Sequence, residues 1–169
     1  MEQNIWQPLG MTSTTFNVEK DPRIKERQVD MSLRTESGTL EHLSTPVFAS
    51  PAEDDCGGVG IYTTAPDYIK ILEDLVSSDS KLLKAGTIDE MFKPQLPDPV
   101  HLETVLKVPA LKQVLGGNLP AGLKVNHGLG GLVTLEPLPT GRPAGSMQWG
   151  GMPNLYWVRI SRFSTERLA

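Results

Sequence analysis

The stretch from Gln148 to Trp157, QWGGMPNLYW, decides how the fold is interpreted, because it places two β-forming runs around a pair of glycines. Trp149, Tyr156 and Trp157 are typical of core aromatics. Two glycines directly after a strand tryptophan also indicate a backbone that another group approaches closely, which is how a strand edge offers N–H groups to a ligand. The stretch therefore predicts a core strand that is also a candidate binding edge.

Short apolar runs separated by glycine and proline surround this stretch. Leu129 to Leu135 and Ser146 to Trp149 flank a turn at Pro137 to Gly141, and Leu155 to Ile160 forms the last run. This spacing predicts an antiparallel meander of about three strands.

Two helices are predicted before the meander. Thr63 or Thr64 can cap the first, whose apolar stripe is expected to pack against a sheet. A second, shorter helix is expected to begin at Thr87, where Glu90 completes a capping-box pattern, and to end before Pro94. The stripe of the first helix consists of Ile69, Leu72, Leu75 and Val76.

The N-terminal third has weaker patterns. Residues 1–16 begin with what we expect to be the end of a helix, which the segment Pro8 to Met11 breaks before residues 12–16 extend. Residues 17–55 are polar and contain three prolines, so we expect a long surface segment with at most short strands. Together with the helices and the meander, this organisation predicts the α+β class.

Composition and charge exclude several classes of function. The chain has 20 acidic and 16 basic residues, a net charge of −4, and 38% hydrophobic residues, so nucleic-acid binding is not expected. The basic cluster Arg159, Arg162 and Arg167 is interpreted as a solvated tail. No run reaches the ~18 apolar residues of a membrane span, and the first residues lack a signal-peptide pattern, so we expect a soluble cytoplasmic protein.

The sequence predicts neither a metal nor another cofactor. His42, His101 and His127 are far apart, and each is more typical of surface or core than of a ligand, although His127 beside Gly128 is placed to line a cleft. The glycine clusters match neither a P-loop nor a dinucleotide motif. Cys56 allows no intrachain disulfide and is interpreted as a small apolar filler.

One tetrapeptide matches the Ser-x-x-Lys pattern of penicillin-recognising enzymes, in which serine and lysine share a helical turn. It runs from Ser78 to Lys81 and follows the first predicted helix. Because Ser77 to Ser80 is typical of a helix exit, we interpret the match as chance rather than as a nucleophile.

Four motifs occur in a fixed order along the chain: Ile5 to Met11 with Thr14 to Phe16, Gly57 to Tyr68, His127 to Gly131, and Trp149 to Gly151. This ordered set resembles the class C β-lactamase-like serine esterases, and within them the family VIII esterases and fungal lovastatin-type acyltransferases of secondary metabolism. The resemblance covers nearly the whole chain up to about Trp157.

The resemblance implies roles for four residues. Trp149, Gly150 and Gly151 match the third motif of the family, which lies on the strand that lines the active site and contacts the substrate. Met152 would donate its backbone N–H to the oxyanion hole. Such a donor typically contributes ~3–4 kcal/mol to acyl transfer.

Two departures from the family pattern argue against activity of this chain alone. The family's Ser-x-x-Lys and Tyr-x-Asn lie upstream of the stretch that matches Pro8 to Met11, and no Tyr-x-Asn occurs in the sequence. Family members also continue past the segment that matches Leu155 to Trp157 with a further strand and helix. Without them, we expect an exposed sheet edge and apolar surface.

We therefore interpret residues 1–169 as the C-terminal portion of a single β-lactamase-related domain that lacks the nucleophile. The resemblance implies an intact enzyme that acts on a small-molecule ester or thioester and transfers the acyl group from a serine to water or an alcohol. This chain is expected to be inactive alone. The alternatives are a noncatalytic binding protein and a nonfunctional gene relic; the oligomeric state stays open.

Overall fold

A computed structural model describes residues 1–45, 47–117, 119–151 and 155–160. The chain divides into two compact units, Met1–Glu73 and Asp74–Ala169. The boundary between them falls inside the helix α3 (Ala65–Val76).

The first unit contains short helical segments and one hairpin. A π-helical turn, η1 (Glu2–Trp6), continues into α1 (Gln7–Leu9) and ends at Gly10, whose φ of 65° is the left-handed conformation of a helix C-terminus. The elements that follow are η2 (Val18–Lys20), α2 (Pro22–Lys25) and the antiparallel strands β1 (Ser32–Arg34) and β2 (Leu40–His42).

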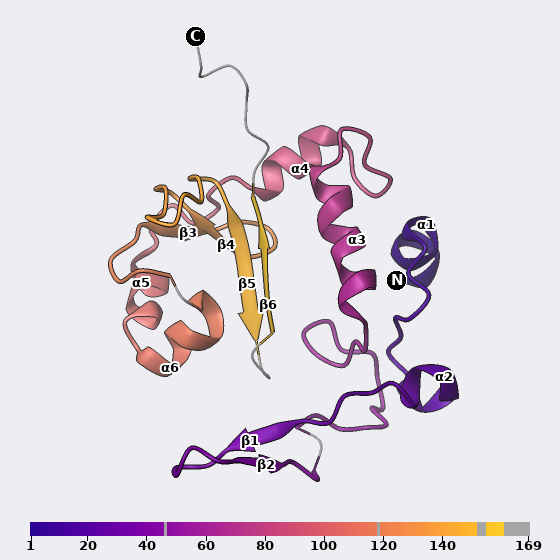
Figure 1. Ribbon diagram of the computed structural model, residues 1–169. Helices are drawn as coiled ribbons and strands as arrows, with labels where there is room; N and C mark the ends of the chain where they lie inside the picture. The colour runs from indigo at the N-terminus through magenta and orange to yellow at the C-terminus, as the bar shows by residue number, and fades with distance from the viewer. Residues whose placement is uncertain (46, 118, 152–154, 161–169) are drawn as a thin grey trace. The chain divides into compact units, whose positions relative to one another are not determined.

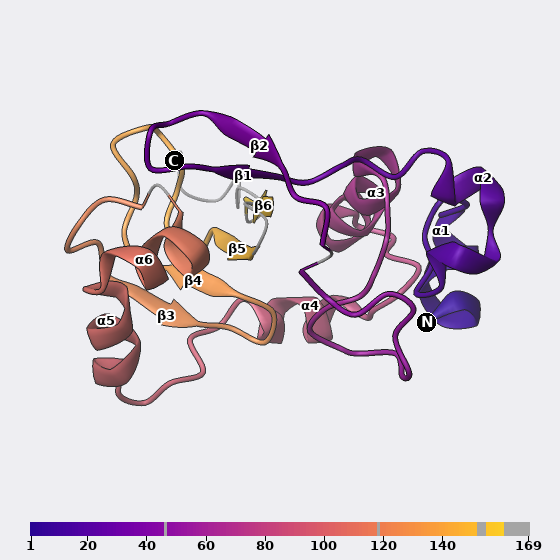
Figure 2. The same cartoon turned by 90° about the horizontal axis from the view of Figure 1, so that it is seen from below.

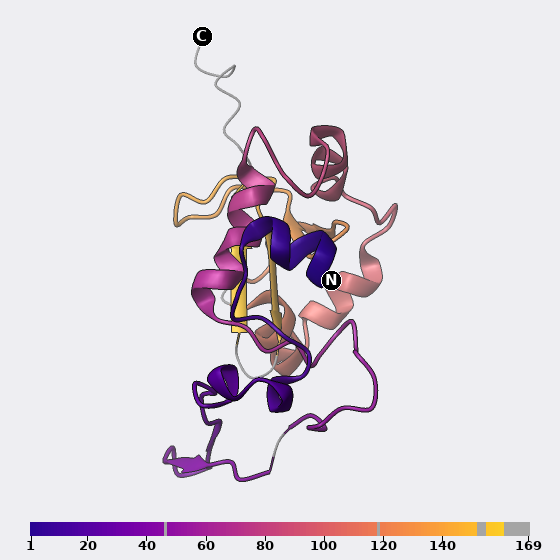
Figure 3. The same ribbon diagram turned by 90° about the vertical axis from the view of Figure 1, so that its right-hand side faces the viewer.

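A buried carboxylate joins the N-terminal segment of this unit to α3. Asp67 Oδ2 accepts hydrogen bonds from the Ser13 backbone N–H at 2.6 Å and from Thr14 Oγ1 at 3.1 Å. Lys70 Nζ lies 2.8 Å from Asp67 Oδ1 and donates to the Gly10 carbonyl oxygen at 2.6 Å. Figure 3 shows the indigo N-terminal segment lying across the magenta helix α3 that carries this carboxylate.

The second unit is built on a four-stranded antiparallel meander in the order β3-β4-β5-β6 (Figure 1). Its strands are β3 (Val125–His127), β4 (Leu132–Thr134), β5 (Met147–Gly151) and β6 (Leu155–Arg159). Its helical elements come earlier in the chain: α4 (Ala85–Met91), α5 (Val100–Leu106), α6 (Pro109–Leu111) and the π-helical turn η3 (Lys112–Gly116).

The core of the second unit lies between the sheet and the helical segments beside it. Figure 2 shows α5 and α6 next to β3 and β4. The side chains of α5 and Trp149 pack against the buried residues of this core. The buried residues are Leu119, Val125, Leu132 and Leu138, and the partly buried ones packed against them are Leu102, Leu106, Leu123 and Trp149.

A side-chain amide holds a loop at the free edge of β3. The buried Asn126 accepts a hydrogen bond from the Leu96 N–H and donates one to the Leu96 carbonyl oxygen, each at 3.0 Å. The next residue, His127, accepts a backbone hydrogen bond from Gln95 N at 2.9 Å. The amide group of Asn126 thus takes the place that a peptide group of a neighbouring strand would have.

The predicted α+β class and the antiparallel meander are confirmed. The described meander has four strands rather than about three, because a turn at Gly128–Gly131 precedes β4 and the additional strand β3 lies before it. The predicted cap of α3 is also confirmed, since Thr64 Oγ1 accepts from the Asp67 N–H at 3.3 Å. The predicted short strands in residues 17–55 are β1 and β2.

Other details of the helices differ from the predictions. The stripe on α3 is only partly buried: Leu75 is buried, but Ile69 and Val76 are exposed. Helix α4 begins at Ala85 with Lys84 at its N-cap and no side-chain cap, so the capping box at Thr87 is wrong. Helices α5 and α6 were not predicted, because their segments are short. Helix α5 begins directly after Pro99, which had been interpreted as ending the previous helix, and α6 begins with Pro109 at its first position.

Two single-residue interpretations, of Cys56 and Arg159, are also corrected. Cys56 is exposed rather than an apolar filler. Arg159 is buried, with 5% of its surface accessible, because its guanidinium lies over the Phe92 ring at 3.6 Å and donates to the Leu75 carbonyl oxygen at 2.7 Å. It is therefore no part of a solvated tail, while Arg162 and Arg167 lie outside the described residues.

Apolar side chains are exposed on β6 and just after it. Leu155 has 69% of its surface accessible, and Val158 and Ile160 have 44% each. Among the described residues, no helix has both the length and the apolar character needed to cross a membrane.

Candidate functional site

The candidate binding strand β5 is paired along its whole length on one side and along less than half of it on the other. Residues Met147 to Gly151 pair with β6, and Trp149 lies opposite Trp157. On the other side, β4 pairs with Met147 and Gln148 and goes no further. In the part of the chain that the structure describes, the backbone from Trp149 to Gly151 therefore has a strand partner on one side only.

The two glycines of this strand have different surroundings. A Cβ at Gly150 would overlap the Tyr156 ring and lie 2.6 Å from the Val114 carbonyl oxygen, so the close approach predicted here comes from the chain itself. The Tyr156 hydroxyl donates to the Gln113 carbonyl oxygen and fixes that ring. A Cβ at Gly151 would meet nothing within 4 Å, so the open part of the strand begins there.

The residue before the tryptophan anchors the strand to two loops. Gln148 is buried, and its Nε2 donates to the Gly116 carbonyl oxygen at 2.7 Å. Its Oε1 accepts from Arg142 Nη1 at 2.5 Å. Burial lowers the pKa of Arg142 from its ordinary value, but a guanidinium remains a cation at neutral pH. Gln148 thus fixes the strand one residue before Trp149.

Trp149 is half-buried between the core and His127. The imidazole of His127 meets the indole in an edge-to-face arrangement, with ring centroids 5.4 Å apart and planes at 79°. The sequence indicated a cleft-lining position for His127 from its glycine neighbour, but not this pairing, because only the register of β3, β4 and β5 brings the two residues together.

The structure places Trp149, Gly150 and Gly151 in the strand β5. Met152, the expected backbone donor, lies outside the described residues. The roles of all four residues stay predictions. Among the described residues, no group of three or more histidine, cysteine or acidic side chains is arranged to hold a metal ion.

The Ser-x-x-Lys match lies in a loop rather than on a helical turn. Helix α3 ends at Val76, and Ser78 follows in a turn. Ser80 Oγ donates to Asp74 Oδ2 at 2.6 Å, and the Lys81 backbone N–H donates to Asp74 Oδ1 at 2.8 Å. The buried carboxylate of Asp74 thus organises this loop, and its serines serve the turn.

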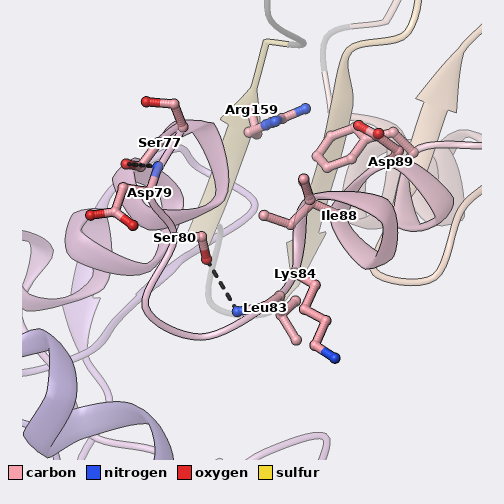
Figure 4. Close-up of a pocket in the computed structure, with 11 residues that line it drawn as sticks. Ser77, Asp79, Ser80, Leu83, Lys84, Ile88, Asp89 and Arg159 are labelled. Carbon is pink, nitrogen blue, oxygen red and sulfur yellow. Dashed lines mark hydrogen bonds between the residues drawn. The ribbon is translucent and has the colours of Figure 1, made fainter.

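This loop forms one wall of a cavity of about 310 Å³ (Figure 4). The Ser80 hydroxyl accepts from the Leu83 N–H at 3.1 Å, and Arg159 and Ile88 form the other walls. Ser78 lines the cavity, whereas Lys81 does not belong to its lining. The tetrapeptide is thus a loop organised by Asp74 rather than one turn of a helix, which supports its interpretation as a structural turn.

Comparison with known proteins defines the class. Residues 1–161 match the family model described as Beta-lactamase, so the chain belongs to the β-lactamase family.

The relatives are fungal acyl-transferring and ester-cleaving proteins. The acyltransferase calJ of Penicillium decumbens is 36% identical over 183 residues, which cover 99% of this chain and 42% of the relative. The lovastatin esterase of Penicillium rubens is 31% identical over 168 residues, which cover 93% of this chain and 40% of the esterase. Simvastatin synthase from Aspergillus terreus, in its LovD6 mutant, superimposes with a TM-score of 0.86 at 33% identity and covers 94% of this chain.

The chain spans about two-fifths of the length of these relatives: 42% of calJ and 40% of simvastatin synthase. The expected family and fold are thereby confirmed. The activity and substrates of the longer relatives remain proposals for this chain.

Proposed function

We propose that this chain supplies the oxyanion strand and part of the acyl pocket of a serine-dependent esterase or acyltransferase that acts on a small-molecule ester or thioester. In this proposal, the acyl group is contacted by Trp149, Gly150 and Gly151, and the backbone N–H of Met152 stabilises the oxyanion. The observation that carries the proposal is the strand pairing: β6 fixes β5 on one side, while pairing with β4 ends at Gln148.

The physical reason is preorganisation. An N–H group stabilises a developing oxyanion best when its position is fixed before the reaction, because no reorganisation is then needed in the transition state. The pairing with β6 and the two hydrogen bonds of Gln148 hold the strand in place. The nucleophile and its base would come from a segment that corresponds to the upstream part of the relatives.

The proposal predicts no ester hydrolysis by this chain alone and recovery of hydrolysis with the upstream part of a relative. The chain would be co-expressed with the segment of simvastatin synthase that precedes the matched region, and p-nitrophenyl butyrate hydrolysis measured. Turnover by the isolated chain, lost in a Ser78→Ala variant, would mean that the tetrapeptide is a nucleophile and that the proposal is wrong.

The backbone donor is tested in the complemented enzyme by a pair of variants at one position. Met152→Pro removes the N–H group, whereas Met152→Ala keeps it. We expect Met152→Pro to lower kcat by roughly 10²–10³-fold and Met152→Ala to change it little. Equal activity of the two variants contradicts the oxyanion assignment.

The acyl pocket is tested by two tryptophans that face each other across the strands. We expect Trp149→Ala to reduce kcat/KM at least tenfold, while Trp157→Ala, on the neighbouring strand, serves as the matched control. An equal loss in both variants indicates a general packing effect and contradicts a specific role for Trp149.

A further inference from the structure

The backbone of His127 is fixed on both sides. Its N–H donates to Asn126 Oδ1 at 2.8 Å, and its carbonyl oxygen accepts from the Gln95 N–H at 2.9 Å. His127 also pairs with Leu132 across the β3–β4 hairpin. The next residue, Gly128, has no room for a Cβ, which would overlap the Met91 carbonyl oxygen. The imidazole is therefore presented from a rigid position.

The hydrogen bonding of the ring defines which nitrogen carries the proton. His127 Nδ1 lies 2.5 Å from the Gly128 carbonyl oxygen. A carbonyl oxygen can only accept, so Nδ1 must be the donor. In the neutral ring, Nε2 is then the hydrogen-bond acceptor. Nε2 makes no hydrogen bond to any residue that the structure describes.

The imidazole ring that carries this hydrogen-bond acceptor lies beside Trp149, the residue proposed to contact the acyl group. The edge-to-face contact places the imidazole beside Trp149, with centroids 5.4 Å apart. Both rings are half-buried, so they combine an apolar wall with one polar atom. Such a combination suits a small apolar molecule that carries a single hydroxyl group.

We propose that His127 Nε2 accepts a hydrogen bond from the hydroxyl group of the alcohol that receives the acyl group, and so acts as a residue that determines acceptor specificity. The inference rests on the proposed acyl-transfer function. In this proposal, the hydroxyl group of the alcohol is bound by His127 beside Trp149. This binding favours transfer of the acyl group to the alcohol over hydrolysis. No proton leaves the hydroxyl in this binding step.

The first test is NMR of the full chain with ¹⁵N-labelled histidine. We expect the His127 spectrum to show the tautomer protonated at Nδ1, with the exposed His42 and His101 as internal references. Cyclohexanol, which can donate a hydrogen bond, is expected to shift the Nε2 resonance, whereas cyclohexanone, which can only accept, is not. A ring protonated at Nε2, or equal shifts with both ligands, overturns the proposal.

The second test separates hydrogen bonding from packing. His127→Phe keeps an aromatic ring beside Trp149 but removes the acceptor, so cyclohexanol should bind about tenfold more weakly, as expected for the loss of one hydrogen bond. The side-chain N–H resonance of Trp149 reports binding in both proteins. An unchanged affinity overturns the proposal, and a native-like amide spectrum shows that the variant is folded.

Neither NMR test needs turnover, so each can fail or succeed independently of the Met152 variants that test the proposed function. In the complemented enzyme, we expect His127→Phe to lower the ratio of transfer to cyclohexanol over hydrolysis. An equal decrease in both rates, which leaves the ratio unchanged, would overturn the assignment of an alcohol.

Discussion

The glycines of the β3–β4 turn provide a sharp test of the packing beneath the candidate site. A Cβ at Gly128 would overlap the Met91 carbonyl oxygen and lie 2.8 Å from Met147 Cε and 2.9 Å from Val133 Cγ2. Overpacking a core typically costs 1–3 kcal/mol. Because the first obstacle is a backbone atom that no rotamer change can move, we expect Gly128→Ala to cost about 3 kcal/mol or more.

The matched control lies two residues further along the same turn. A Cβ at Gly130 would meet Met147 Sδ and Met91 Cε at 3.5 Å, which is an ordinary contact. Gly130 is exposed and does not have a positive φ. Gly130→Ala should therefore be neutral or stabilise the fold by ~0.4–1 kcal/mol, because alanine restricts the unfolded chain.

Urea unfolding of the full chain, followed by circular dichroism, measures both effects. With a slope of ~2 kcal/mol/M, a loss of about 3 kcal/mol lowers the midpoint by about 1.5 M. We expect this decrease in Gly128→Ala and none in Gly130→Ala. If the two midpoints agree to within about 0.3 M, the account of packing around Gly128 is refuted.

Two further predictions concern the first unit. Burial alone would raise the pKa of Asp67, but the hydrogen bonds from Lys70, Ser13 and Thr14 outweigh it and hold that pKa below its usual value. The resulting stabilisation is present above the unfolded pKa of ~3.9 and is lost as the pH falls through the lower folded pKa. At pH 6 we expect the native chain to be more stable than Asp67→Asn by about 1–3 kcal/mol. This difference in stability should disappear below the folded pKa of Asp67. Urea unfolding midpoints of both proteins at pH 6 and at the lower pH measure this difference in stability. A difference that is equally large at the lower pH contradicts the role of the carboxylate. Exposed Cys56 should react completely with a thiol reagent in native buffer; a reaction that requires denaturant contradicts the described exposure.

The sequence patterns predicted the elements whose signals are local. The threonine cap of α3 and the alternation of apolar runs with turns depend on neighbouring residues, and both are found in the structure. Leu129 to Leu135 was predicted as one run, but its first residues belong to the turn Gly128–Gly131. Two glycines of this turn are required by distant atoms, since a Cβ at Gly131 would lie 2.6 Å from the Gln148 carbonyl oxygen. Local patterns cannot indicate such contacts.

The same distinction applies to the candidate site. The consecutive residues Trp149 to Gly151 were found from sequence because they form one motif. The hydrogen bonds of Gln148 and the contact between the rings of His127 and Trp149 depend on how distant segments, including the strands β3, β4 and β5, come together. No spacing in the sequence defines that arrangement. Arg159 was misinterpreted for a related reason: its charge is typical of a surface residue, but Phe92 and the Leu75 carbonyl oxygen provide a buried environment for it.

The amide of Asn126 has a consequence for the behaviour of the protein at high concentration. A free strand edge invites the addition of a strand from another molecule, which is a common route to aggregation. By bonding to both backbone groups of Leu96, Asn126 occupies the edge of β3 with the chain's own loop. We therefore expect strand addition at β3 to be disfavoured; among the strands that the structure describes, β6 lies at the opposite end of the meander and carries the exposed Leu155 and Val158.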